Sequence, residues 1–275
     1  MSDDMTIDWS YSNARLYESC PRSLFYHYWQ RTGANDDSEA VDEQILYGQP
    51  GVGAVIGTAI HTALSEHISR WSRGEQTGLE IVRQVARDYI HEVFNNNSTV
   101  VSDANPESLV HTSDAHIGRF FRVIWPQFRD HRYILHEENC SFEVGSTKVW
   151  VRPDLCTRDS GEFVITDWKS RQPAIFEDPS LQLRVYALWG HQQFEPDIDR
   201  ISVQLVFTSD GRIERQSVDK EDLAQLNDRI ADDVLKWGDP NDRTNFPTDE
   251  SFQKCSSCPY LPSCNVGQTT VTEGQ

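Results

Sequence analysis

Three charged residues near the middle of the chain have the types and spacing of a hydrolytic centre. Asp154 follows a proline, and Asp167 and Lys169 come at the end of an apolar run at 163–165. Side chains two residues apart on a strand point to the same face, so Asp167 and Lys169 would point together and Trp168 away from them. Two carboxylates can bind a hard divalent cation that activates a water, and an ammonium can orient that water and stabilise charge on a phosphate. An isolated pair of this kind is usually an exposed ion pair, but here it ends a strand with a buried pattern, which favours a functional site.

The elements that must position these residues change along the chain from helices to strands. Apolar residues at helical spacing predict helices over 13–29, 52–71, 79–94 and 115–128. Short alternating segments then predict three antiparallel strands over 140–144, 148–156 and 163–169, with Asp154 on the second strand. A helix that Pro179 opens and that runs through Trp189, strands over 201–207 and 212–218, and a helix over 221–237 follow. The sequence therefore predicts an α/β core preceded by a helical region.

The helix predicted over 52–71 carries two histidines in different positions. Its apolar stripe consists of Ile56, Ile60, Ala63, Leu64 and Trp71. His67 points into the middle of that stripe and is predicted to be a core residue. His61 lies off the stripe and follows Gly57 by one turn, where the missing side chain would let a ligand or another backbone approach. His61 is therefore the histidine that we expect at a site.

Cysteines gather near the C-terminal end of the sequence. Three of the six form the motif Cys255-x2-Cys258-x5-Cys264, and Cys20 is the candidate for a fourth ligand. A disulfide framework is disfavoured in a cytosolic enzyme, and the remaining two, Cys140 and Cys156, fit strand patterns as small buried hydrophobic residues. On geometry alone, four thiolates suit zinc and an iron–sulfur cluster equally.

The charge of the chain leaves the partner open. The formal net charge is -18, which favours an acidic protein that binds no nucleic acid, because phosphate binding depends largely on Lys and Arg. The excess acid is spread along the chain, as suits a salt-rich cytoplasm, where screening within roughly 3 Å at molar salt lets a local group of arginines hold a phosphate. Residues 1–10 lack the apolar segment of a signal peptide, and no apolar run of membrane-spanning length follows. We expect a soluble, cytoplasmic protein with no membrane partner.

Two segments resemble motifs II and III of the RecB-like PD-(D/E)xK nucleases. They are Val151-Arg152-Pro153-Asp154-Leu155 and Phe163-Val164-Ile165-Thr166-Asp167-Trp168-Lys169-Ser170. In that family the two acids bind Mg or Mn, and the lysine assists the water. The backbone carbonyl of the residue between the second acid and the lysine is commonly a further metal ligand. The resemblance implies these catalytic and metal-binding roles for Asp154, Asp167, the Trp168 carbonyl and Lys169, on a mixed central sheet flanked by helices.

Two further motifs extend this resemblance. Gly57-Thr58-Ala59-Ile60-His61 is similar to motif I, whose histidine binds the metal, and an imidazole nitrogen suits Mn better than Mg. Gln182 and Tyr186 lie four residues apart, on one face of the helix that Pro179 opens. They resemble the Q-x-x-x-Y motif, which lines the site and contacts DNA.

The cysteines resemble those of one branch of the family. A single N-terminal cysteine, here Cys20 in the run from Tyr11 to Arg22, paired with a distant C-x2-C-x5-C motif is similar to the iron–sulfur nucleases of the RecB group. That group includes CRISPR-associated exonucleases and AddB-type helicase-nucleases, in which four cysteines bind a 4Fe-4S cluster. The resemblance implies the same cluster on Cys20, Cys255, Cys258 and Cys264.

Taken together, these patterns predict one nuclease domain over 1–275. It would comprise a helical region at 9–133, an α/β core at 134–237 and a cysteine-rich loop at 250–265. We expect a Mg- or Mn-dependent DNA exonuclease or end-trimming nuclease that prefers single strands, in CRISPR adaptation beside an integrase or in repair beside a helicase. The candidate phosphate contacts are Arg22, Arg152, Arg171 and Arg184. The alternative is a non-catalytic DNA-binding module that retains the fold and the cluster for structure.

Overall fold

The computed structural model describes residues 7–32, 51–96, 104–171 and 179–274, and the chain divides into two compact units. Unit 1 consists of residues 1–49, 143–150 and 227–275. Unit 2 consists of residues 50–142 and 151–226. The two ends of the sequence therefore belong to the same unit, and the middle of the chain forms the other.

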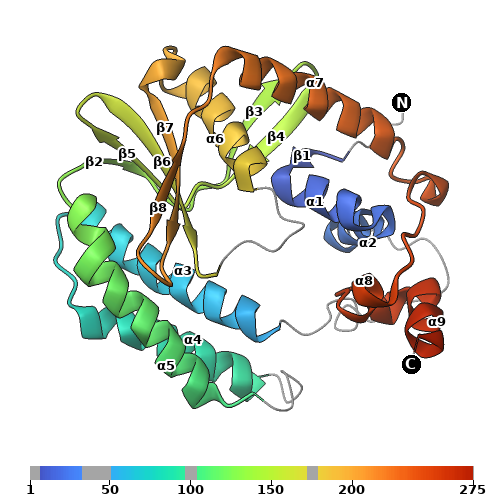
Figure 1. Ribbon diagram of the computed structural model, residues 1–275, viewed down its shortest axis with the longest axis horizontal. Coiled ribbons are helices and arrows are strands. Elements are labelled where there is room, and N and C mark those ends of the chain that lie inside the picture. The colour runs from blue at the N-terminus through green and yellow to red at the C-terminus, as the bar shows by residue number, and fades with distance from the viewer. Residues whose placement is uncertain (1–6, 33–50, 97–103, 172–178, 275) are drawn as a thin grey trace. The chain divides into compact units, whose positions relative to one another are not determined.

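Unit 2 contains a five-stranded mixed sheet (Figure 1). Its strands, in spatial order, are β2 (Arg132–Leu135), β5 (Leu155–Asp159), β6 (Glu162–Lys169), β7 (Ile201–Phe207) and β8 (Ile213–Gln216). The central strand β6 pairs antiparallel with β5 and parallel with β7. Residues 163–168 of β6 are all buried, which explains why this strand has a continuous apolar run instead of an alternating pattern.

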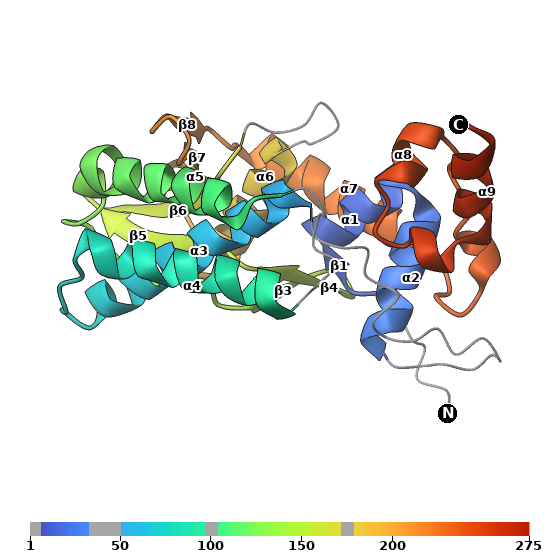
Figure 2. The same ribbon diagram turned by 90° about the horizontal axis from the view of Figure 1, so that it is seen from below.

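Helices cover both faces of this sheet. On one side, α3 (Val52–Ser72), α4 (Leu79–Asn96) and α5 (Pro106–Arg119) pack on one another (Figures 1 and 2). Apolar residues of α3 share a buried cluster with Trp168 of β6. On the other side, α6 (Pro179–Gln193) packs on β6 and β7, with Gly190 facing Phe163. Because Phe163 and Trp168 have opposite parity on β6, α3 and α6 lie on opposite faces of the sheet.

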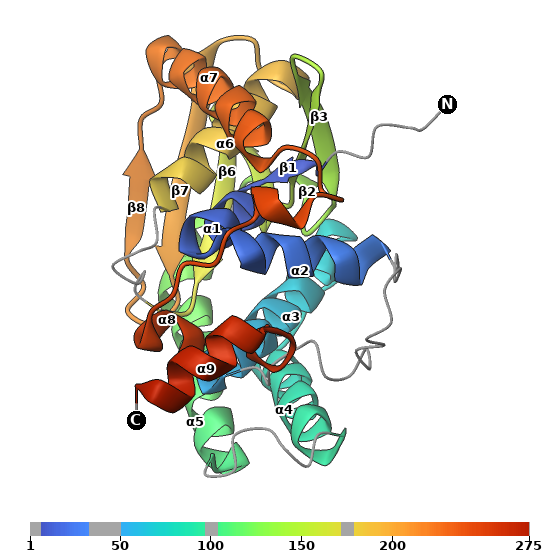
Figure 3. The ribbon, with the colours of Figure 1, turned by 90° about the vertical axis from the view of Figure 1, so that its right-hand side faces the viewer.

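Unit 1 brings together helices from the two ends of the sequence (Figure 3). They are α1 (Tyr11–Ser19), α2 (Pro21–Thr32), α8 (Phe252–Ser256) and α9 (Asn265–Glu273). Strand β1 (Trp9–Ser10) pairs in parallel with β4 (Thr147–Val151), in a three-stranded sheet that β3 (Cys140–Val144) completes. The indole of Trp9 donates a 3.1 Å hydrogen bond to Asp233 on α7 (Lys220–Trp237).

Short irregular helices connect these elements. A π-helical turn at Phe120–Ile124 and a 3-10 turn at Trp125–Gln127 follow α5. Further 3-10 turns lie at Ile198–Arg200, Arg243–Asn245 and Leu261–Ser263. None of the helices in the described ranges is long and apolar enough to cross a membrane.

Three sequence predictions about these elements are wrong. The helix expected over 13–29 is two helices, because Cys20 is extended (φ -163°, ψ 115°) before Pro21, and a proline disfavours helical backbone at the residue before it. The single strand expected over 148–156 is β4 and β5, which belong to different sheets, so the predicted three-stranded antiparallel arrangement does not form. Pro153 interrupts the ladder, and Asp154 lies in the connection directly before β5 rather than on a strand. The helix expected from residue 115 begins at Pro106 with Asn105 as its N-cap, and continues as π and 3-10 turns.

The other predicted helices and strands are confirmed, with ends shifted by a few residues. Strands β1 and β2 were not predicted, since β1 is two residues long and β2 four. The α/β fold class is confirmed.

Candidate active site

The predicted charged residues meet at one end of β6, within unit 2. Asp167 and Lys169 project from the end of β6, and Asp154 immediately precedes the neighbouring strand β5. His61 reaches this region from α3, and Tyr186 from α6 on the opposite face of the sheet. The position at a strand end is important because backbone pairing fixes the strand, whereas the side chain of Lys169, its last residue, remains 28% exposed.

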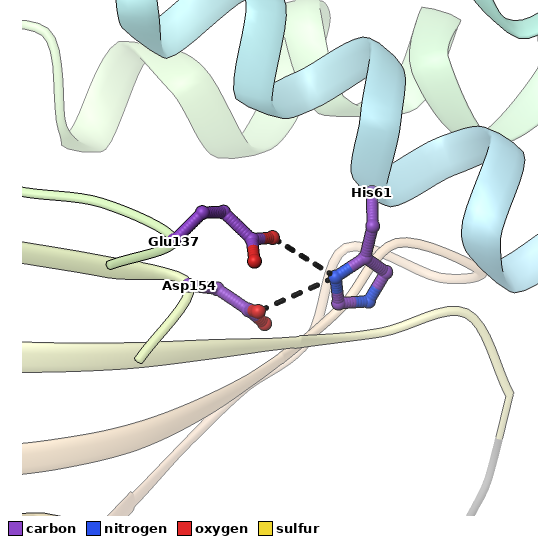
Figure 4. A group of neighbouring side chains, drawn as sticks. All are labelled: His61, Glu137 and Asp154. Atoms are coloured by element: carbon purple, nitrogen blue, oxygen red, sulfur yellow. Dashed lines mark ion pairs between the residues drawn. The ribbon is translucent and has the colours of Figure 1, made fainter. Parts of the chain in front are cut away.

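His61 is surrounded by acceptor atoms from three other segments, of which Glu137 and Asp154 are drawn in Figure 4. Its Nδ1 lies 3.3 Å from Oδ1 of Asp154 and 3.5 Å from Oε1 of Glu137, and its Nε2 lies 3.1 Å from the carbonyl oxygen of Trp168. One ligand atom from each of His61, Glu137 and Asp154 lies within 4.8 Å of the others. An imidazole nitrogen and two carboxylate oxygens suit Mn²⁺ or Mg²⁺, so this donor set fits the divalent cation expected from the sequence.

Asp154 is fixed by the backbone of the adjacent strand. Its Oδ2 accepts a 2.6 Å hydrogen bond from the backbone N–H of Trp168, and the residue is only 6% exposed. Burial opposes ionisation of this carboxyl, but His61, the Trp168 N–H and Lys169 outweigh burial and lower its pKa. Asp154 therefore presents an ionised Oδ1 toward His61, whereas its second oxygen is held by the backbone.

An ion pair and a series of hydrogen bonds hold the ammonium of Lys169 in place. Its Nζ lies 2.6 Å from Oδ2 of Asp167 and donates a 3.0 Å hydrogen bond to Oε1 of Gln182. The Gln182 amide donates to the hydroxyl of Tyr186 (3.0 Å), which donates in turn to the carbonyl of Arg152 (3.0 Å). Asp167 and Lys169 thus point together as expected for their spacing on a strand, and Trp168 is buried on the other face. These contacts fix the ammonium of Lys169 beside the carboxylate of Asp167.

The charges and burial around Lys169 raise the pKa of Asp167. Burial and the charge of Asp154 raise the pKa of Asp167 to about 6, against the opposing effect of Lys169. Burial and the carboxylates of Asp167 and Asp154 raise the pKa of the Tyr186 hydroxyl well above its ordinary value, so Tyr186 is a neutral donor at this site. Excess negative charge is concentrated where a cation would reduce the repulsion between the carboxylates.

Glu137 belongs to the site but was not predicted from the sequence. Its backbone has a positive φ of 50°, its N–H donates a 3.0 Å hydrogen bond to the carbonyl of Pro153, and its Oε2 lies 3.0 Å from Nε of Arg152. An acidic residue just beyond a short apolar strand was the available signal. Adjacent acids, here Glu137 and Glu138, are so common on surfaces that this signal is weak.

A cavity of about 850 Å³ opens beside this centre. His61, Glu137 and Arg152 line it together with small polar residues of α3, namely Thr58, Thr62, Ser65 and Ser69. Gly57 of α3 also lines it, and a Cβ at Gly57 would lie 3.2 Å from the hydroxyl of Ser170. The absent side chain at Gly57 therefore permits the close approach between α3 and the end of β6 that its sequence position suggested.

The four candidate phosphate contacts are not all in one place. Arg152 is the one that the structure brings to the centre, with its side chain 60% exposed and tied to Glu137. Arg22 belongs to unit 1, where its Nε donates a 2.7 Å hydrogen bond to the carbonyl of Phe246. Arg171 and Arg184 lie in unit 2, just after β6 and on α6.

The four cysteines of the predicted cluster all belong to unit 1. Cys20 lies at the break between α1 and α2, Cys255 on α8, Cys258 just beyond it and Cys264 at the N-cap of α9. The sulfurs of Cys20 and Cys264 accept hydrogen bonds from backbone N–H groups at 3.4 and 3.3 Å. Burial raises the pKa of the Cys258 thiol, and the nearby thiols of Cys20 and Cys264 raise it further. Residues more than 200 positions apart in sequence are thus brought together.

Comparison with solved structures identifies the fold. A protein from Eubacterium rectale, described as a "Putative exonuclease", has a TM-score of 0.51 and 12% sequence identity over 94% of this chain and 88% of its own. At that identity the likeness concerns the fold alone. A second structure, SSO0001, has a TM-score of 0.33 and 15% identity over 89% of this chain and 95% of its own, which is too low to carry an argument. No curated protein matches the sequence.

A family model matches nearly the whole chain. The match extends over residues 8–265, and its family is described as the PD-(D/E)XK nuclease superfamily. It includes every residue of the centre at the end of β6 and the four cysteines of unit 1. The chain therefore belongs to the PD-(D/E)XK nuclease superfamily.

Proposed function

We propose that this nuclease hydrolyses DNA phosphodiester bonds with Mn²⁺ or Mg²⁺, acting at free ends and preferring single strands. The observation that carries the proposal is the placement of Lys169, 2.6 Å from Asp167, beside the donor set of His61 and Asp154. Membership of a nuclease superfamily supports the reaction class. The end-trimming mode and the preference for single strands rest on the resemblance of the sequence motifs to the RecB-like branch.

The residues of the centre divide the chemistry between them. A bound divalent cation would neutralise charge on the scissile phosphate and lower the pKa of a water. Lys169, held by Asp167 and Gln182, would orient that water and stabilise the negative charge that develops on the phosphate. Tyr186 and Gln182 would keep the ammonium in place and face the DNA from α6, and Arg152, Arg171, Arg184 and Arg22 are the proposed phosphate contacts.

The test is cleavage of end-labelled single- and double-stranded DNA in the presence of Mn²⁺. Asp167→Asn and Lys169→Met should each reduce the cleavage rate by at least about 100-fold, as expected for the loss of a group that stabilises the transition state. Lys220→Met, at the exposed start of α7, is the matched control and should cleave as the wild type does. Equal rates for the wild type and the two site variants would contradict catalysis and leave the non-catalytic DNA-binding module as the explanation.

We further propose that Cys20, Cys255, Cys258 and Cys264 bind a 4Fe-4S cluster. The two N–H···S hydrogen bonds in unit 1 support a thiolate site, since such bonds stabilise cluster sulfurs. A brown anaerobic preparation containing iron and sulfide is expected, and a colourless one containing zinc would overturn the proposal.

The cluster would act as a structural cross-link. Joining Cys20 to Cys255 closes a loop of more than 200 residues, and the loss of unfolded-chain entropy would stabilise the fold by about 5 kcal/mol. The biological setting that fits these features is a cytoplasmic one. The enzyme would trim DNA fragments beside an integrase in CRISPR adaptation, or process ends beside a helicase in repair, and the genes adjacent to its own would distinguish the two.

A further inference from the structure

We propose that His116 and Thr208 are positioning residues for Lys169, on which they act through its backbone carbonyl. His116 lies on α5 and Thr208 directly after β7, so neither belongs to the group of side chains that would hold the cation. The inference rests on the proposed function, since it concerns the residue that would orient the attacking water. It gives α5, a helix of the region that precedes the sheet, a part in the reaction.

The last residues of β6 are paired with a strand on one side only. The ladder between β5 and β6 ends where Leu155 faces Thr166. Strand β7 continues alongside residues 167–169, with Phe207 opposite Lys169. Among the described strands, β7 alone therefore supports the backbone of Lys169, and a group that fixes this side fixes the backbone from which the ammonium extends.

Thr208 binds the carbonyl oxygen of Lys169 twice. Its backbone N–H donates a 2.9 Å hydrogen bond to that oxygen, and its hydroxyl donates a second one at 3.2 Å. Thr208 is fully buried, so water does not replace the hydroxyl when it is removed. Together with the contacts of the ammonium to Asp167 and Gln182, these bonds hold Lys169 at both ends of the residue.

His116 determines the direction of the Thr208 hydroxyl. Its Nδ1 lies 2.9 Å from Oγ1 of Thr208, and both residues are buried. A hydroxyl has one proton, which Thr208 gives to the Lys169 carbonyl, so Oγ1 accepts from His116, and Nδ1 carries the proton. Burial and the charge of Arg119 lower the pKa of His116, so the ring is neutral at neutral pH. Donation from Nδ1 therefore turns the threonine proton toward Lys169.

Arg119 attaches α5 to the same segment at a second point. Its Nη1 donates to the carbonyl of Ser209 and lies 3.5 Å from that of Thr208. These bonds fix the backbone that follows β7, so Thr208 stays beside Lys169. An alternative is that His116 and Arg119 only fasten α5 to the sheet. Fastening would affect the free energy of unfolding alone, whereas positioning also affects the rate at which bound DNA is cleaved.

The first test measures kcat and KM separately for cleavage of a single-stranded DNA oligonucleotide with Mn²⁺, under conditions in which circular dichroism shows every variant to be folded. His116→Leu and Thr208→Val should each lower kcat by about tenfold with little change in KM, because the ammonium is displaced while the phosphate contacts remain. His111→Leu replaces an exposed histidine of α5 and, as the matched control, should cleave as the wild type does.

Conservative variants identify the groups responsible. Thr208→Ser retains the hydroxyl, and His116→Asn places an amide donor near the position of Nδ1, so both should recover most of the lost kcat. A Ser variant as slow as Thr208→Val would show that the hydroxyl is not the cause and would overturn the inference.

A double variant tests whether the two residues act in series. If His116 acts only through Thr208, His116→Leu/Thr208→Val should have the kcat of Thr208→Val, because the second substitution removes nothing further. A fall of about 100-fold, the product of the two single effects, would mean that the residues act independently and would contradict the proposed series.

NMR of ¹⁵N-labelled histidine locates the proton of His116 without any cleavage. The His116 signals, assigned by their loss in His116→Asn, should show the proton on Nδ1 at neutral pH and should shift in Thr208→Val. A proton on Nε2 would mean that the Thr208 hydroxyl donates to His116 instead of Lys169, which is incompatible with the inference.

The same measurements separate this inference from the proposed function. Cleavage by the wild type with unchanged kcat in His116→Leu and Thr208→Val would refute the positioning role and leave the nuclease proposal standing. A wild type that cleaves no DNA would refute the proposed function and, with it, the positioning role, even if Nδ1 of His116 carries the proton.

Discussion

His67 should make the protein sensitive to acid. It lies on α3, only 4% exposed, with its ring 4.4 Å from the ring centre of Trp125 and 4.7 Å from that of Phe121. Neither ring nitrogen has a hydrogen-bond partner among the described residues. Burial in this apolar, aromatic surrounding lowers the pKa of His67 from its ordinary value of 6.5 to about 4. The folded protein therefore holds this imidazole neutral at pH values at which the unfolded chain has already bound a proton.

The size and direction of the effect follow from the two pKa values. Between pH 6.5 and 4 the unfolded state binds a proton at His67 and the folded state does not, so the free energy of unfolding falls as the pH falls. The loss is about 3 kcal/mol at pH 4, since each pKa unit corresponds to about 1.4 kcal/mol. Below pH 4 both states are protonated, and His67 contributes no further loss.

Urea unfolding of the wild type and His67→Leu at pH 7 and pH 4, followed by circular dichroism, measures this effect. The difference in the free energy of unfolding between the two pH values should be about 3 kcal/mol smaller in His67→Leu than in the wild type. His111→Leu replaces an exposed histidine of α5 and should leave that difference unchanged. The same pH dependence in all three proteins would refute the assignment of His67 as a buried, neutral histidine whose protonation opposes folding.

Two further predictions concern residues that support the active site. Thr208 is fully buried, and its hydroxyl donates to the Lys169 carbonyl (3.2 Å) and lies 2.9 Å from Nδ1 of His116. Thr208→Val removes these hydrogen bonds, so it should lower the free energy of unfolding by about 2 kcal/mol. Urea unfolding measures this change, Thr208→Ser should recover most of it, and a Val variant as stable as the wild type would contradict it. Gly57→Ala should raise or preserve stability, because alanine favours helix by about 1 kcal/mol, but it should slow DNA cleavage by displacing Ser170, whose hydroxyl is 3.2 Å from the added Cβ. The double variant Gly57→Ala/Ser170→Ala removes that contact and should restore the rate; if it cleaves as slowly as Gly57→Ala, the contact is not the cause.

Local patterns in the sequence were sufficient for most elements, but not for their assembly into sheets. The apolar run of β6 and the period of two predicted that Asp167 and Lys169 point together, and the ion pair between them agrees with this. The alternating pattern from residue 148 to 156 is continuous, although Pro153 ends one strand before the next begins in another sheet. Periodicity describes which face a residue occupies, whereas the choice of sheet depends on partners that are distant in sequence.

The position of Glu137 in the site could not be predicted from the sequence. Its place beside His61 depends on a left-handed backbone, a hydrogen bond to the Pro153 carbonyl and an ion pair with Arg152. The partners of these contacts are some 15 residues away in the sequence or more, and nothing in the local pattern distinguishes Glu137 from Glu138. His61 could be separated from His67, in contrast, because the helical period alone places one off the apolar stripe and the other within it.

Unit 1 consists of segments that are far apart in the sequence, which determines when it can fold during synthesis. Its segment at residues 1–49 is synthesised before unit 2, and its partners in residues 227–275 are synthesised after all of unit 2. At about 5–20 residues per second, more than 200 residues separate Cys20 from Cys255 by roughly 10–40 s of translation. Unit 2 can therefore fold before residues 227–275 of unit 1 have been synthesised. A truncated product of an interrupted message would retain the segments of the active-site centre but lack the C-terminal half of unit 1.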